Sequence, residues 1–275
     1  MTISILQLFL GFFGAVLIAW ASWKTQALSN SGALAALIMG TIVFGLGGLP
    51  WALILLVFFI SSSALSRFFK KKKAKVEEKF SKSSRRDIGQ VWANGGIATL
   101  FVIIFVFYPS ASWTWWAFSA AFAAVNADTW ATELGVLSKK TPGMITTWKL
   151  VDPGTSGGVT LLGTSASLAG SALIGVLAVT LSPYPFIING LISFLIITLA
   201  GLAGSLVDSL LGGTIQAIYY CPKCQKETER HPEHLCGHAT TFNRGWTFMN
   251  NDWVNTACSI SASIITILFW YFLNG

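Results

Sequence analysis

Two apolar stretches of the sequence each carry a carboxylate close to their end. Asp128 lies in an alanine-rich stretch that continues to Glu133, and Asp208 follows a stretch rich in small residues. A carboxylate in a membrane-spanning helix costs about 2.5–3.5 kcal/mol at the bilayer centre and less near its surface, so it usually has a function. We therefore predict that Asp128 and Asp208 bind a cation, the alternative being a satisfied intramembrane hydrogen-bond cluster.

Other polar residues accompany these aspartates. Glu133 is five positions after Asp128 and so points about 140° away on a straight helix. The two could share one ion only if the helix unwinds; otherwise one binds the ion and the other pairs with a Lys or Arg. Asp252 and Asn255 open the last apolar stretch, where we predict a third metal ligand at Asp252. An Asn or Asp there is also an ordinary helix N-cap.

A glycine-rich segment lies directly before another apolar stretch. It contains Gly154, Thr155, Ser156, Gly157 and Gly158. Glycines let backbone N–H groups approach an anion, and the positive end of the following helix adds to the attraction. We predict a phosphate-binding loop with Lys149 as a nearby cation, although it is not a Walker A motif. Tight helix packing is the alternative explanation for these glycines.

Cysteine spacing indicates a small metal site. Cys221-x2-Cys224 is followed by Cys236-x-His238, with His231 and His234 between them. Three thiolates and one imidazole are a frequent ligand set of structural zinc. We predict zinc bound by Cys221, Cys224, Cys236 and one histidine, for which we name His238 although the spacing leaves the choice of histidine open, with an unmetallated loop as the alternative. Cys258, within the last apolar stretch, is expected to be a core residue.

Composition and hydropathy predict the elements that must position these residues. Of the 275 residues, 53% are hydrophobic and 11% charged, whereas a soluble domain carries about 25% charged residues. Apolar runs of about 20 residues match the bilayer thickness. We expect a single all-α, polytopic membrane domain over 1–275, with a loop at 213–252 that contains a small zinc-ribbon-like element. The predicted spans are 4–22, 31–48, 50–66, 92–109, 112–134, 157–181, 186–212 and 253–273.

The distribution of charge predicts the orientation. The densest basic stretch runs from Arg67 to Arg86, and the positive-inside rule places it in the cytoplasm. Alternation through the spans then puts all functional loops on the cytoplasmic face and both termini outside the cytoplasm, in a plasma membrane of bacterial type. We interpret the net charge of +7 as attraction to anionic lipid and not to nucleic acid. Trp113, Trp115 and Trp116 are expected in an outer aromatic belt.

Acidic residues, a glycine-rich loop and cations at one membrane surface favour phosphate chemistry. Mg²⁺ prefers carboxylates together with substrate phosphates. A site at the bilayer edge suits a substrate with a lipid tail and a phosphate head. The residues alone therefore predict phosphoryl or nucleotidyl transfer to a lipid.

The ordered motifs resemble one integral-membrane family, which contains plant phytyl phosphate kinase and a widespread vertebrate multi-pass protein. The matching segments cover roughly residues 20–270 and are 90–96, 126–135, 153–160, 208–216 and 251–255. The family pattern usually has Asn where Ser156 stands. The resemblance implies an isoprenoid monophosphate kinase that uses a nucleoside triphosphate such as ATP or CTP. The chain is also distantly similar to polyprenol kinases and lipid cytidylyltransferases.

The resemblance also implies roles for individual residues. Asp128 and Asp208 would hold Mg²⁺, with Glu133 as a further ligand or a support for one, while Lys149 and Arg86 (or Arg85) neutralise phosphate charge. The amides around Gly154–Gly158 would cradle nucleotide phosphates. Hydrogen bonds that orient the reacting groups would come from Asn94, Asn126 and Asn255.

Three other classes of protein stay open. A transporter or flippase of a phosphorylated lipid would use broken helices with a polar site at the midplane. A CTP-dependent lipid nucleotidyltransferase would use the same types of residue. A non-catalytic scaffold would use the zinc loop to bind a partner, and the sequence also leaves a homo-oligomer open.

Overall fold

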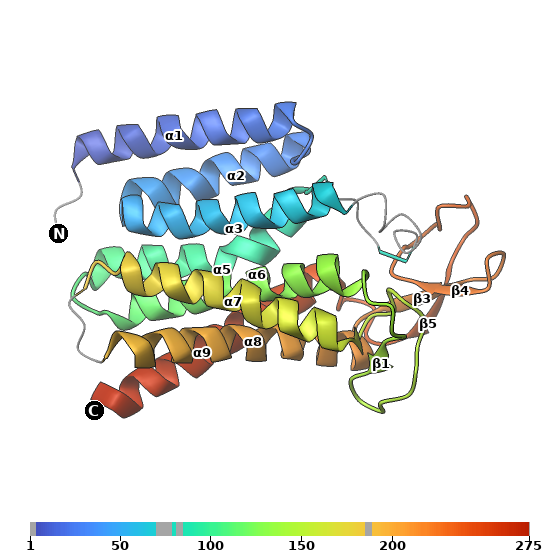
Figure 1. Ribbon diagram of the computed structural model, residues 1–275. Coiled ribbons are helices and arrows are strands. Elements are labelled where there is room, and N and C mark those ends of the chain that lie inside the picture. Colours follow the sequence, from blue (N-terminus) through green and yellow to red (C-terminus); the bar gives the residue numbers. More distant parts are fainter. Residues whose placement is uncertain (1–3, 70–78, 81–84, 185–188, 275) are drawn as a thin grey trace.

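Helices make up most of the chain. A computed structural model describes residues 4–69, 79–80, 85–184 and 189–274, and Figure 1 shows its long helices lying roughly side by side. The basic residues Lys70–Lys73, Lys75 and Lys82 lie outside the described residues. The helices are α1 (Ile5–Lys24), α2 (Asn30–Ile42), α3 (Leu49–Phe68), α5 (Ile88–Phe107), α6 (Trp113–Gly135), α7 (Leu161–Thr180), α8 (Gly190–Thr214) and α9 (Asn251–Asn274), with a π-helical turn η1 (Val43–Gly47) that extends α2. The prediction of an all-α polytopic membrane protein is confirmed.

Seven of the described helices, with α2 and η1 counted as one, are long and apolar enough to cross a membrane. The predicted spans agree with the helices to within four residues at each end. Helix α6 has the same length class but is less apolar, and it differs in its surroundings. It packs against α3, α5, α7, α8 and α9, so its side chains meet protein on all sides and do not need to be lipophilic.

Burial of α6 corrects the prediction for its tryptophans. Trp115 and Trp116 are 1% and 9% exposed, respectively. The indole of Trp115 stacks on Phe118, contacts Trp51 edge-on, and donates a hydrogen bond to the Ala178 carbonyl at 3.0 Å. These side chains form part of the core of the bundle and do not belong to an outer belt, because neighbouring helices cover this end of α6.

The chain ends and the strand-bearing loops lie at opposite ends of the bundle. Figure 1 shows both termini at one end and the strands at the other. In the 136–160 loop, β1 (Gly143–Met144) pairs antiparallel with β2 (Gly158–Val159). In the 215–250 segment, β3 (Ile218–Cys221), β4 (Lys226–Thr228) and β5 (Thr241–Arg244) form an antiparallel sheet in the order β4-β3-β5. The loops predicted to carry the chemistry therefore meet at one end of the bundle.

Candidate active site

A cavity of about 280 Å³ lies at the loop end of the bundle. Helices α3, α5, α6, α7, α8 and α9 and the glycine-rich loop all contribute to its wall. The residues predicted from the sequence that line it are Arg86, Asn94, Asp128, Glu133, Gly154, Thr155, Ser156, Gly157, Gly158, Asp208 and Asn255. Segments far apart in the sequence thus meet around one polar space.

Asp128 on α6 and Asp208 on α8 face each other in this cavity. Their carboxyl groups lie within hydrogen-bonding reach of each other. One helical turn earlier on each helix are Ala124 and Gly204, and a Cβ added to Gly204 would lie only 2.7 Å from the Ala124 Cβ. The missing side chain at Gly204 therefore permits the close approach of the two helices that brings the aspartates together.

The pair could hold a divalent cation. Oδ2 of Asp208 is buried and accepts no hydrogen bond from any described residue. Two neighbouring carboxylates repel each other unless a proton or a cation lies between them. Among the described residues, only the Cys/His cluster already gathers three or more metal-ligand groups at close range. A two-carboxylate site without a complete protein cage is the kind that Mg²⁺ uses when substrate phosphates and water supply the other ligands.

A third carboxylate, which the sequence did not reveal, comes from the strand segment. Glu229 follows β4, lines the cavity, and lies close enough to Asp208 for their charges to interact. Its Oε1 accepts hydrogen bonds from Ser156 Oγ at 2.8 Å and Gln216 Nε2 at 2.9 Å. No local motif marks Glu229, because its place depends on how the 215–250 segment folds back over the bundle.

Glu133 occupies a different part of the cavity from the aspartate pair. Helix α6 is continuous from Trp113 to Gly135, so Asp128 and Glu133 do not converge by unwinding. Glu133 accepts a 2.7 Å hydrogen bond from Ser66 and interacts electrostatically with Arg86. Burial lowers the pKa of Arg86 to about 10, and the charge of Glu133 opposes this shift, so Arg86 is still a cation at neutral pH. Glu133 therefore lies close enough to Arg86 for their charges to interact, as expected if only one of the two carboxylates binds an ion.

Backbone contacts fix Arg86 at the cavity edge. Its N–H donates to the Ala27 carbonyl at 3.0 Å, and its carbonyl accepts from Ser29 N at 2.9 Å. Gly32 makes this approach possible, because an added Cβ would lie 2.1 Å from the Arg86 oxygen. The guanidinium lies over the rings of Phe58 and Phe59, at 5.5 and 5.8 Å from their centroids. The turn between α1 and α2 thus positions the cation.

The glycine-rich loop leads into α7 and packs against the end of α8. Gly157 has φ +85°, and an added Cβ would lie 2.4 Å from Gly213 Cα, so only glycine fits there. Thr160 caps α7 by accepting a 3.0 Å hydrogen bond from Gly163 N. Within the loop, Gly158 N donates to the Thr155 carbonyl. The loop is therefore a folded turn, and it places the positive end of α7 at the cavity that Asp208 also lines.

Three predicted residues do not line the cavity. Asn126 is fully buried and links helices: its Nδ2 donates to the Gly170 carbonyl at 2.8 Å, and its Oδ1 accepts from Ser61 at 3.0 Å. Asp252 lies in the first turn of α9, where the N-cap role belongs to Asn250. Lys149 lies on an exposed loop, whereas Lys140 lines the cavity. Sequence distance from the glycines was a poor guide here, because the 136–160 loop folds back on itself.

Lys140 and Lys149 are a matched pair for testing which cation meets phosphate. We expect Lys140→Ala to weaken binding of tripolyphosphate about two- to fivefold, the range of one partly screened charge, and Lys149→Ala to change it less than that. Calorimetry at low and at physiological salt measures both. Equal losses in the two variants would contradict the placement of Lys140.

The cysteine-rich segment forms a compact four-ligand cluster. The ligand atoms of Cys221, Cys224, His234 and Cys236 all lie within 4.8 Å of one another. The separations are 3.6 Å for Cys221 Sγ–Cys236 Sγ, 3.5 Å for Cys224 Sγ–His234 Nδ1 and 3.4 Å for His234 Nδ1–Cys236 Sγ. Tetrahedral zinc with its usual bond lengths has ligand separations of about 3.5–3.8 Å. The cluster could hold such an ion.

The histidine in this cluster differs from the one predicted. His234 is buried beside the thiols, whereas His238 is exposed and its Nδ1 lies 3.4 Å from the Cys236 carbonyl. A tight turn, in which Gly237 N donates to the His234 carbonyl, points His234 inward. The hydrogen bond with His234 lowers the pKa of Cys236 to about 6, which favours the thiolate form that binds metal.

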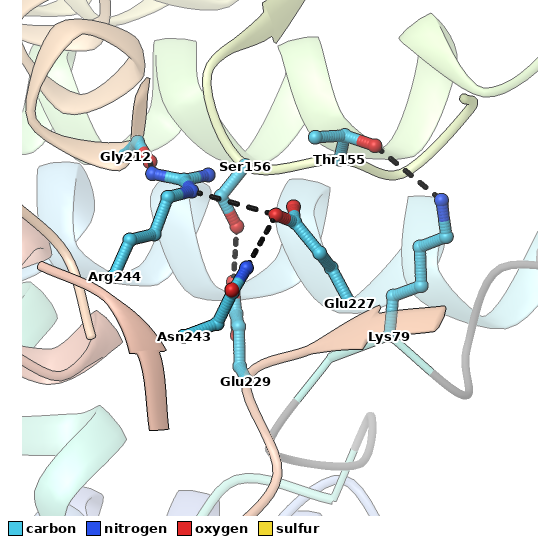
Figure 2. Close-up of polar contacts among 8 residues, drawn as sticks. All are labelled: Lys79, Thr155, Ser156, Gly212, Glu227, Glu229, Asn243 and Arg244. Carbon is cyan, nitrogen blue, oxygen red and sulfur yellow. Dashed lines mark hydrogen bonds and ion pairs between the residues drawn. The ribbon is translucent and has the colours of Figure 1, made fainter. Parts of the chain in front are cut away.

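Side-chain hydrogen bonds join the glycine-rich loop to the strand segment and to Lys79, as Figure 2 shows. Ser156 Oγ donates to Glu229, and Lys79 Nζ donates to Thr155 Oγ1 at 3.3 Å. Lys79 also pairs with Asp152 at 3.7 Å, and its carbonyl accepts from Glu229 N at 2.8 Å. The fold of the cysteine-rich segment thus determines where Glu229 and the glycine-rich loop lie.

Sequence comparison gives the family. The pattern of the family described as integral membrane protein DUF92 matches residues 13–263. The chain belongs to this family. Protein PGR of Arabidopsis thaliana is 36% identical over 237 residues, with 74% of this chain and 77% of PGR covered. An uncharacterised membrane protein of Methanocaldococcus jannaschii is 33% identical over 215 residues, with 78% and 85% covered.

A cyanobacterial relative extends this range. An uncharacterised membrane protein of Synechocystis is 31% identical over 188 residues, with 66% of this chain and 69% of the relative covered. No solved structure matches the chain significantly. Membership of the DUF92 family agrees with the resemblance noted in the sequence and with the helical bundle.

Proposed function

We propose that this protein is an isoprenoid monophosphate kinase, which transfers the terminal phosphoryl group of a nucleoside triphosphate to a prenyl or phytyl phosphate. The observation that supports this most is the composition of one cavity. It combines the Asp128–Asp208 pair, the glycine-rich loop before α7 and the half-buried cation Arg86. Phosphoryl transfer depends mainly on positioning and on neutralising charge, and these are the groups that do both.

The reaction needs little from a protein base. An oxygen of the lipid phosphate attacks the terminal phosphorus of the nucleotide, the bond to the bridging oxygen breaks, and the nucleoside diphosphate leaves with that oxygen. The second pKa of a phosphate monoester is about 6, so the attacking oxygen is already ionised at neutral pH. The protein must therefore overcome the repulsion between two polyanions.

Each side of the cavity has a role in that task. The positive end of α7 and the glycine-rich loop bind the donor phosphates. Arg86 binds the acceptor phosphate, and Asn94 and Asn255, which also line the cavity, orient the reacting groups by hydrogen bonds. Asp128 and Asp208 would hold Mg²⁺, which when bound neutralises charge on the phosphates. We place this end of the bundle at the cytoplasmic membrane surface, where nucleotide and lipid are both accessible.

The test is a transfer assay with two positions of label. Purified protein is incubated with Mg²⁺, with ATP or CTP, and with farnesyl, geranylgeranyl or phytyl monophosphate. We expect γ-label in the lipid diphosphate and no α-label in any lipid. Transfer of α-label from CTP would indicate a nucleotidyltransferase instead. Absence of both, in protein that elutes as a single folded species, would contradict the kinase and direct attention to uptake assays in proteoliposomes.

A further inference from the structure

A second cavity lies among the first helices of the chain. It is lined by residues of α1, α2, η1, α3 and α5 and has a volume of about 60 Å³. Its wall is apolar along most of its length, with Ala15, Ala36, Phe44 and Leu55 among its side chains. None of the reacting groups in the proposed kinase reaction lies in this apolar space.

The two cavities share one polar boundary. Arg86, Gln90 and Asn94 line both of them. Gln90 is held by the capping box of α5 with Asp87, and Arg86 is held by the α1–α2 turn and by the rings of Phe58 and Phe59. A ligand at this boundary therefore meets a fixed cation on one side and an apolar space on the other.

The apolar cavity runs along the helices and away from the site. On α1 it extends from Ser22, at the loop end, to Ala15, which lies about 10 Å away at 1.5 Å per residue. Ala36 and Gly40, which are about one turn apart on α2, line it on one face, and Phe44 of η1 continues this wall. An elongated apolar space that begins at a phosphate-binding cation has the shape and polarity of a lipid phosphate.

We propose that this cavity binds the head-proximal part of the isoprenoid tail, with the lipid phosphate on Arg86. The volume is below the roughly 300–1,000 Å³ of sites that enclose a whole drug-sized ligand, so only the first part of the tail lies inside and the remainder continues into the bilayer. The cavity then selects a flexible, phosphate-headed chain by its first carbons and not by its full length. This inference takes the head group from the proposed function, so its test measures binding and not transfer.

The experiment uses a farnesyl monophosphate analogue that carries a photoreactive diazirine in its first isoprene unit. After irradiation of the detergent-purified full chain, mass spectrometry identifies the labelled residues. We expect label on Met39, Leu55 or Phe59, all of which line the cavity. An excess of farnesyl monophosphate should reduce that label at least about fivefold, whereas farnesol or a phospholipid should not.

Matched variants test whether the space itself matters. Ala36→Phe fills the cavity from α2, and Ala169→Phe places the same ring on the exposed face of α7. We expect at least a fivefold loss of label in the first and none in the second. Leu55→Phe fills the same space from α3, so it replaces Ala36→Phe if that protein does not fold. Where transfer is measurable, KM for the lipid should rise about tenfold, the equivalent of about two methylene groups excluded, with KM for the nucleotide unchanged.

The outcomes separate this inference from the kinase proposal. Competed label in the cavity without phosphoryl transfer would overturn the kinase proposal and leave the tail site standing. Transfer with label on the exposed face of α7 or α9 would do the reverse. Label that survives both cavity-filling variants, or that farnesol and phospholipid displace equally well, would overturn the tail site.

Discussion

Asp128→Asn and Asp208→Asn should each lower phosphoryl transfer about 10²–10³-fold, the usual loss when one group that stabilises transition-state charge is removed. The double variant should be about as slow as either single one, because residues that act as a unit give non-additive losses. Initial rates at saturating nucleotide and lipid measure this. Full activity in Asp128→Asn would exclude Asp128 as a metal ligand.

Stability should change in the opposite direction. The two carboxyl groups lie within hydrogen-bonding reach of each other, so neutralising one removes a repulsion in the metal-free protein. We expect an unchanged or higher melting temperature without Mg²⁺ in either variant. A merely structural pair would instead lose stability and activity together.

Asp152→Asn is the matched control for the acidic pair. Asp152 lies at the same end of the bundle, but its side chain is 83% exposed and forms an ion pair of 3.7 Å with Lys79. Exposed ion pairs contribute about 0–1 kcal/mol. Activity in this variant should stay within about threefold of the parent protein. A loss as large as that of Asp208→Asn would show that any charge change at this end of the bundle is harmful.

Purified protein should contain about one zinc ion per chain, and Cys221→Ser or His234→Ala should lose it. A structural zinc site contributes its binding free energy to folding, with about 10–16 kcal/mol in small peptides. Loss of the ion should therefore loosen the β3–β4 hairpin, in which Cys221 pairs with Lys226. Elemental analysis and hydrogen exchange over residues 218–244 measure the two effects.

His238→Ala is the control for the choice of ligand. His238 is exposed and outside the four-ligand cluster, so this variant should retain its zinc. Zinc loss in His238→Ala and retention in His234→Ala would reverse the ligand assignment. A full complement of zinc in Cys221→Ser would exclude the cluster as the zinc site.

Zinc loss should also reduce phosphoryl transfer, although none of the four cluster residues is among the described residues that line the cavity. The link is Glu229, which follows β4 and accepts hydrogen bonds from Ser156 and Gln216. Glu229→Gln should therefore lower activity while the zinc content stays at one per chain. If Cys221→Ser lost zinc but kept full activity, the cluster would stabilise the loop without positioning the site.

The apolar runs alone determined the number and limits of the membrane helices, because a bilayer of fixed thickness demands spans of fixed length. The same reasoning identified Asp128, Asp208 and the glycines, since polar groups and flexible backbone are rare within such spans unless they have a use. Cysteine spacing was sufficient to predict the three cysteines of the Cys/His cluster. Each of these features depends on neighbours along the chain.

Only the tertiary structure decided which residues share the cavity. Glu229 reaches Asp208 because the strand segment folds back over the bundle, and Lys140 replaces Lys149 because of the course of the 136–160 loop. The turn after His234 brings this histidine, and not His238, into the Cys/His cluster. Asn126 and Trp115 are buried because other helices surround α6. These contacts join residues far apart in the sequence, so they depend on packing between helices and loops, which hydropathy and residue spacing do not encode.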